Sequence, residues 1–194
     1  MQHSRTKVFF IGFNKTATTA FHNLFLENGY KSAHNHIKLN KKINIGKRIF
    51  CNLQNNFPIL HSIDTNDVYS DLGGSFENKI VEGCFFYREL HYEYPESYFI
   101  LQTRSKKQWL ASRKKWRNLP QRHADILGIT KEEVVLNWSK EWDLHHYNVR
   151  SFFRNKKNFL EFNIEKDNIN NLINFLSKDY YIRKEYWKKR NVST

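Results

Sequence analysis

A short apolar run near the N-terminus, followed at once by glycine and a polar turn, is the feature that most constrains the fold. Residues 8–11 are all apolar, and Gly12 ends the run. An uninterrupted run of this kind is typical of a strand buried on both faces of a parallel sheet. Over residues 18–27 apolar side chains recur at three- and four-residue spacing, which predicts a helix that ends at 28–29, Asn-Gly. The chain therefore opens with strand, turn and helix.

The rest of the chain repeats this alternation. Further buried strands are predicted at 58–63, 98–101 and 159–162, and helices at 85–94, 105–116, from Thr130 onward, and at 169–176. The stripe of the long helix that we expect to face the core is Val135, Trp138, Trp142, His145, Val149 and Phe152. The polar segments 31–56 and 64–75 are predicted as loops. We therefore expect one α/β domain over residues 1–194, with a mainly parallel sheet between two layers of helices.

The net charge of +13, from 32 Lys and Arg against 19 Asp and Glu, predicts an anionic partner. The charge is uneven along the chain: +8 over 1–60, −6 over 61–100, +9 over 101–160 and +2 over 161–194. A surface that coats a polyanion more often spreads its charge, so this division favours local anion sites. Solvated lysines on exposed faces are the alternative interpretation.

Several classes of protein do not fit the sequence. Cys51 and Cys84 cannot build a disulfide framework and have no metal-ligand spacing, which favours a reducing, cytoplasmic compartment. The paired histidines at 34–36 and 145–146 have no third ligand at an informative spacing, so we expect no metal site. Because no apolar run reaches the length of a membrane span, we also expect no membrane partner.

The turn at residues 12–19 has the composition of an anion-binding loop. Free backbone amides and the helix dipole converge between a buried strand and a helix, while Lys15 and three threonines add further donors. The loop is a poor match to the nucleotide-binding pattern G-x-x-x-x-G-K-[ST], because Ala17 replaces its second glycine and Thr18 its lysine. An ordinary turn capped by threonine is the alternative.

A second anion site is predicted after the strand at 98–101. Arg104 follows this strand, and Ser112 lies two helical turns into the next helix, so that both side chains can reach one phosphate. Five further Lys and Arg between 106 and 115 add positive potential. The alternative is that the helix face with Trp109, Ser112 and Trp116 simply packs on the sheet.

Both segments resemble one family. Residues 9–19, FFIGFNKTATT, resemble the 5′-phosphosulfate loop of sulfotransferases that use 3′-phosphoadenosine 5′-phosphosulfate (PAPS). Residues 94–104, YPESYFILQTR, with Trp109 and Ser112, are similar to the 3′-phosphate motif of the same family. The resemblance implies a P-loop-like fold and, as PAPS-binding residues, Asn14, Lys15, Thr16, Ala17, Thr18, Thr19, Arg104 and Ser112. Ala17 stands where the family usually has glycine; with a positive φ it would be strained by about 1 kcal/mol.

The resemblance also implies a reaction. A sulfuryl group moves in line from PAPS to a hydroxyl or amine, leaving adenosine 3′,5′-bisphosphate (PAP), without a metal. Lys15 would neutralise the charge that develops on the bridging oxygen. A general base should take the acceptor's proton, and Asp71 aligns with an aspartate often seen in bacterial-type members. Asp64, Glu82, His34 and His61 are further candidates for this base.

Two more functions remain open at this point. A kinase of the P-loop class acting on a nucleotide or sugar would share the fold, but the sequence offers no Walker lysine. A basic RNA-binding module would suit the charge and the 16% of aromatic residues, but these aromatics lie at core spacing. For a sulfotransferase, a carbohydrate or another hydroxylated small molecule is the expected acceptor, in a shallow site built from 31–60, 64–80 and a loop at 117–130.

Overall fold

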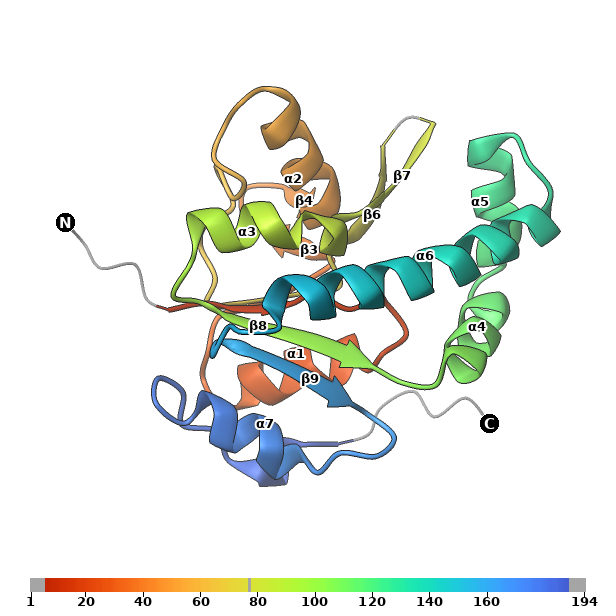
Figure 1. The fold of residues 1–194 in the computed structure, drawn as a ribbon. Coiled ribbons are helices and arrows are strands. Elements are labelled where there is room, and N and C mark those ends of the chain that lie inside the picture. The colour runs from red at the N-terminus through yellow and green to blue at the C-terminus, as the bar shows by residue number, and fades with distance from the viewer. Residues whose placement is uncertain (1–5, 77, 189–194) are drawn as a thin grey trace.

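The computed structural model describes residues 6–76 and 78–188 as a sheet between two layers of helices (Figure 1). Its strands are β1 (Val8–Phe10), β2 (Ser32–His34), β3 (His36–Lys38), β4 (Lys42–Asn44), β5 (Val68–Ser70), β6 (Gly73–Phe76), β7 (Lys79–Glu82), β8 (Tyr98–Thr103) and β9 (Phe159–Asn163). Its α-helices are α1 (Thr18–Glu27), α2 (Ile45–Gln54), α3 (Tyr87–Glu93), α4 (Lys106–Lys115), α5 (Leu119–Leu127), α6 (Lys131–Phe153) and α7 (Ile169–Leu176). Single 3₁₀ turns lie at Gly83–Phe86 and Lys184–Tyr186.

The main sheet has the strand order β4-β3-β2-β5-β1-β8-β9. The five strands from β2 to β9 in this order run parallel, while β3 and β4 are antiparallel additions at one edge. Strands β6 and β7 form a separate hairpin. The chain leads from β1 through α1 to β2 on one side of β1, and the later connection from β5 crosses to β8 on its other side, so the carboxyl end of β1 is the topological switch point where α/β sheets bind ligands. The predicted three-layer α/β fold is confirmed.

Alternation along the central strands divides the core between the two faces of the sheet. Phe9 and Phe99 pack toward α2, α3 and the second half of α6, whereas Phe10 and Ile100 pack toward α1 and α7. Figure 1 shows α3 and α6 on one face and α1 and α7 on the other. A third cluster joins α4, α5 and the first half of α6 around Phe13, which directly follows the turn glycine. The loop after β1 is therefore anchored in a buried cluster of its own.

Most predicted elements are present with their expected bounds. The helix at 18–27 is α1, and the strands at 98–101 and 159–162 are β8 and β9. Ser105 caps α4, and Thr130 begins α6 with a complete capping box. Of the expected stripe on α6, four side chains are buried: Trp138, Trp142, His145 and Val149. Its two outer positions are half-buried, because Val134 and Phe153 take the core positions instead of Val135 and Phe152.

Four predictions between residues 31 and 130 are wrong. Residues 58–63 form turns and not a strand: Ile59 is buried, but its amide donates to the Glu93 carboxylate and its carbonyl accepts from Asn52, which replaces ladder bonding. The strand of this region is β5, within the segment 64–75 predicted as loop. The segment 31–56 folds into β2, β3, β4 and α2, and 117–130 contains α5. Three-residue strands are too short to show a period, so they form because the sheet offers them partners.

Candidate active site

A cleft of about 480 Å³ opens where β1, β2, β5 and β8 end. All the predicted site residues except Thr16 line it, together with His34, a further candidate for the base. Thr16 is fully buried, and its hydroxyl donates to the Phe13 carbonyl, so it shapes the loop from behind. The lining residues used below are Asn14, Lys15, Ala17, Thr18, Thr19, His34, Asp71, Arg104, Ser112, Lys115, Trp116 and Glu165. Segments far apart in the sequence thus share one cleft.

The loop after β1 is held open toward the cleft by its backbone. Lys15 and Ala17 both have left-handed conformations, with φ of 65° and 63°, and within the described chain no side chain caps the start of α1. The first amides of a helix have no partner within it, so they remain available to an anion. Trp109 of α4 fixes the loop by donating from Nε1 to the Asn14 carbonyl at 3.0 Å. A side chain at Gly12 would place a Cβ 2.1 Å from the Gln102 carbonyl oxygen, so only glycine fits there.

The burial of Lys15 and the charges around it do not all shift its pKa in the same direction. Burial lowers its pKa, Asp71 opposes that shift, and the neighbouring cations Arg104 and Arg117 lower the pKa further. The ammonium lies 5.2 Å from the centre of the Trp116 ring, a cation–π contact at the mouth of the cleft. A dianion in the cleft would relieve the repulsion between these cations.

Arg104 is held at the cleft by an acid that the sequence interpretation missed. Its Nε and Nη2 donate to Oε1 of Glu165 at 3.1 and 3.0 Å, and the Ser105 amide donates to Oε2 at 2.9 Å. Nη1 of Arg104 also reaches the Lys15 carbonyl at 3.4 Å. Ser112 of α4 lines the same cleft. The signal that could have identified Glu165 is its place just after the predicted strand at 159–162, at the same edge of the sheet as Arg104.

Asp71 and His34 lie side by side in the cleft. The Asp71 side chain is 14% exposed, and burial, followed by the charge of Glu82, raises its pKa to about 7. Nε2 of His34 lies 3.7 Å from Oδ2 of Asp71, but burial lowers the His34 pKa to about 4. The imidazole is therefore neutral at pH 7, and this contact is not an ion pair. Of the two groups, Asp71 is the stronger base at neutral pH.

Asp64, His61 and Glu82, which the sequence also offers as bases, lie outside the cleft. Asp64 pairs with Lys7 at 2.5 Å and accepts from the Tyr94 hydroxyl at 3.0 Å, at the amino end of β1. His61 stacks on Phe57 with ring centres 4.7 Å apart and does not line the cleft. Glu82 is buried in an ion pair with Arg113 behind the cleft. These positions favour Asp71 for the role.

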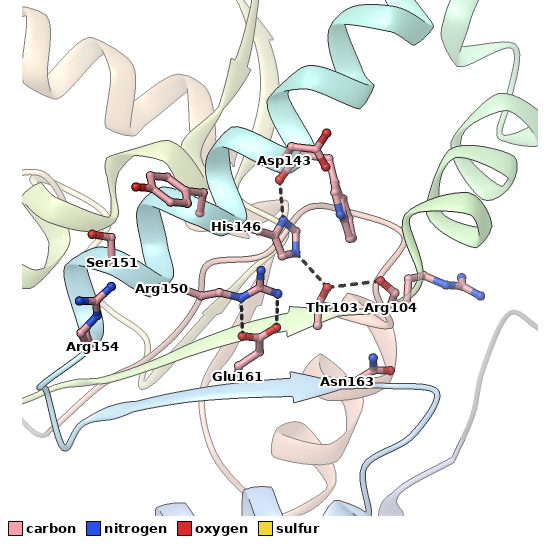
Figure 2. Close-up of a pocket in the computed structure, with 11 residues that line it drawn as sticks. Thr103, Arg104, Asp143, His146, Arg150, Ser151, Arg154, Glu161 and Asn163 are labelled. Carbon is pink, nitrogen blue, oxygen red and sulfur yellow. Dashed lines mark hydrogen bonds and ion pairs between the residues drawn. The ribbon is translucent and has the colours of Figure 1, made fainter.

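A second cavity, of about 460 Å³, lies on the far side of Arg104, between α6 and the ends of β8 and β9 (Figure 2). Two of its charged groups are paired with each other: Arg150 donates twice to the Glu161 carboxylate, at 2.8 and 2.6 Å. Nε2 of His146 lies 2.9 Å from the Thr103 hydroxyl and ties the end of β8 to α6. The contacts that line this cavity hold the end of β8, which carries Arg104, whereas the predicted anion-binding groups lie together in the first cleft.

The described residues show no group of three His, Cys, Asp or Glu placed to hold a metal ion. Within residues 6–76 and 78–188, no helix is long and apolar enough to cross a membrane. Both cysteines are free thiols.

Comparison with known proteins assigns a family. A search of curated proteins finds no match. A family model for the sulfotransferase domain matches residues 7–142, a span that contains the loop after β1, Asp71, Arg104 and Ser112. The matched span is more than half of the 194 residues. The chain therefore belongs to the sulfotransferase domain family.

Proposed function

We propose that the protein transfers a sulfuryl group from PAPS to a hydroxyl or amine of an acceptor, without a metal ion. The observation that carries this proposal is the meeting, in one cleft, of an amide-rich loop, a strand-end arginine and a carboxylate that is half-protonated near neutral pH. A kinase of the P-loop class needs a lysine and metal ligands at different positions. An RNA-binding module needs exposed aromatic residues gathered into a platform, whereas the most exposed aromatics that the structure describes, Phe57, Tyr92, Tyr147 and Tyr181, lie on separate segments of the chain.

The residues of the cleft fit the donor's charged groups. The phosphosulfate would lie at the N-terminus of α1, where free amides, Lys15 and the hydroxyls of Thr18 and Thr19 converge. The 3′-phosphate would lie between Arg104 and Ser112, which line the cleft together. The cleft volume of about 480 Å³ is within the usual range for small-molecule sites.

The chemical step follows from this placement. The acceptor oxygen attacks sulfur, a new S–O bond forms, and the bond from sulfur to the bridging phosphate oxygen breaks with its electron pair leaving on PAP. Lys15 stabilises the charge that develops on that oxygen. Asp71 accepts the proton of the acceptor hydroxyl, and a pKa of about 7 suits a general base at neutral pH. Nε2 of the neutral His34 lies 3.2 Å from the Thr18 hydroxyl, so His34 orients the part of the loop that faces the sulfuryl acceptor.

Transfer of radiolabelled sulfate from PAPS, measured over a panel of hydroxylated acceptors in excess EDTA, tests the proposal. We include carbohydrates first, because the charged, hydroxyl and amide side chains among those that line the cleft suit a polar acceptor. Lys15→Ala should lower kcat by about 100-fold or more, the usual loss for one electrostatic group at a reacting oxygen. Lys114→Ala, an exposed lysine of α4 outside the cleft, is the matched control and should leave kcat unchanged.

Binding experiments distinguish a sulfotransferase from a kinase and from an RNA-binding module. PAP should bind in EDTA, with an affinity that Mg²⁺ does not raise. Tighter, Mg²⁺-dependent binding of ATP would favour a kinase, and tighter binding of RNA than of PAP would favour a nucleic-acid module. Transfer at normal kcat by Lys15→Ala would refute the mechanism.

A further inference from the structure

An ion pair lies buried behind Asp71, and no step of the proposed reaction uses it. Arg113 of α4 is completely buried, and its Nη2 donates to Oε1 of Glu82 at 2.8 Å. Glu82 is the last residue of β7 and is 9% exposed. Charged groups as buried as these are rare outside functional sites unless each is fully paired.

Arg113 is far from fully paired. Among the described residues its Nε and Nη1 have no hydrogen-bond partner. The guanidinium instead lies between two indoles, 4.3 Å from the Trp138 ring centre and 5.0 Å from that of Trp109. Leaving buried donors unsatisfied costs stability, and a well-packed apolar pair would often be more stable at such a place. Stability alone therefore gives no reason for the pair.

The geometry around Gly73 connects the pair to the base. Gly73 pairs with Glu82 across the β6–β7 hairpin. A Cβ built on Gly73 would lie 3.5 Å from Oε2 of Glu82 and 3.7 Å from Oδ1 of Asp71, so the two carboxylates stand at most about 7 Å apart. One oxygen of Glu82 thus binds Arg113 while its second oxygen faces the glycine beside Asp71.

We propose that Glu82 and Arg113 are positioning residues for the base: Arg113 pairs with the Glu82 carboxylate and fixes it beside Gly73, and that fixed negative charge strengthens Asp71 as a proton acceptor. Two like charges at this separation in a partly buried site disfavour ionisation of the more weakly stabilised one. Glu82 has Arg113 as its partner, so Asp71 is the group that takes the proton. This inference rests on the proposed role of Asp71.

Further charged and polar groups face Asp71 from every element packed around it. They are Lys15 from the loop after β1, His34 from β2, the Gly73 backbone, Glu82 from β7 and Arg113 from α4. Lys15 and Arg113 favour the ionised Asp71, while burial and Glu82 oppose it and prevail. Glu141 of α6 interacts with Glu82 and Arg113, and its own pKa is raised to about 6 by burial and then by Glu82. Glu141 is therefore a carboxylate of the same cluster that acts on the pair and not on the base.

The experiment follows the titration of Asp71 by carboxyl NMR on protein labelled with ¹³C at aspartate, with Asp71→Asn assigning the signal. Glu82→Gln should lower the midpoint by on the order of one pH unit, as expected for loss of a unit charge about 7 Å away. Glu82→Asp keeps the charge and should leave the midpoint near that of the wild type. Glu132→Gln, which removes an exposed acid from the first turn of α6, is the matched control and should leave it unchanged.

The acidic limb of the pH profile of kcat/KM should move with the NMR midpoint in each variant. If Glu82→Gln does not fold, the double variant Glu82→Gln/Arg113→Met removes both buried charges, and its midpoint should fall by a smaller amount, because Arg113 acts in the opposite direction. An Asp71 midpoint that does not fall in Glu82→Gln, or in the double variant where Glu82→Gln does not fold, overturns the inference. Absence of sulfuryl transfer would refute the proposed function and leave the NMR result to decide this inference separately.

Discussion

Replacing Ala17 with glycine tests the conformation of the loop after β1. Ala17 has φ 63° and ψ 23°, a left-handed conformation that costs a residue with a Cβ about 1–2 kcal/mol. Glycine removes this cost, but it also raises the conformational entropy of the unfolded chain, which lowers stability by about 0.4–1 kcal/mol. We therefore expect Ala17→Gly to stabilise the protein by about 0.5–1 kcal/mol. For a domain of this size the melting temperature should rise by about 1–4 °C.

Thermal unfolding followed by circular dichroism measures this change, and Ala20→Gly is the matched control. Ala20 lies in α1 with 2% exposure, so the same substitution there loses helix propensity and a buried methyl group. It should destabilise the protein by about 1 kcal/mol or more. If Ala17→Gly lowers the melting temperature as Ala20→Gly does, the left-handed conformation does not govern the stability of the loop.

Two further predictions concern the cleft. Arg104→Ala should weaken PAP binding by about 10- to 100-fold in calorimetry, because it removes a charge-assisted contact, while Arg154→Ala in the second cavity should leave PAP affinity unchanged. Asp71→Asn should abolish transfer and yet raise stability to urea at pH 8.5. The folded-state pKa of Asp71 is raised to about 7, so its buried charge costs stability above that pH. Asparagine also tolerates the φ of 50° at this position. The gain should shrink as the pH falls from about 7 to 4, and equal stability of the two proteins at pH 8.5 would contradict the raised pKa.

The sequence predicts the longer apolar strands and the periodic helices of this fold better than it predicts the short strands, and the reason is physical. Strands β1 and β8 are apolar runs buried on both faces, and α1, α6 and α7 have a clear helical period. The pattern of apolar residues in the sequence therefore predicts where these elements lie. Strands β2 to β5 have three residues each, and their side chains are mixed. The run at 58–63 has the composition of a strand, but Asn52 and Glu93 bind its backbone groups in turns. A local pattern cannot show which distant side chain will take a backbone donor.

The same distinction applies to the site. Lys15, Arg104 and Ser112 were predicted because each has a fixed offset from a strand end, and the structure gathers them in one cleft. Glu165 is 61 residues from the arginine it binds. Glu82 and Arg113 are 31 residues apart on different elements. Their roles depend on tertiary contacts, which carry no local signature beyond an acid in a buried segment.

The distribution of charge in space refines what the net charge of +13 means. Three of the nine Lys and Arg of the first basic block, Lys38, Lys41 and Lys42, are exposed on β3, on β4 and in the turn between them, at the edge of the sheet. Lysines on an edge strand prevent pairing with further chains, which is a function independent of any ligand. In the cleft, three basic side chains, Lys15, Arg104 and Lys115, face two acids. Under the proposed function, binding of the donor depends on these few charges together with the free amides, whereas Lys38, Lys41 and Lys42 protect the edge of the sheet.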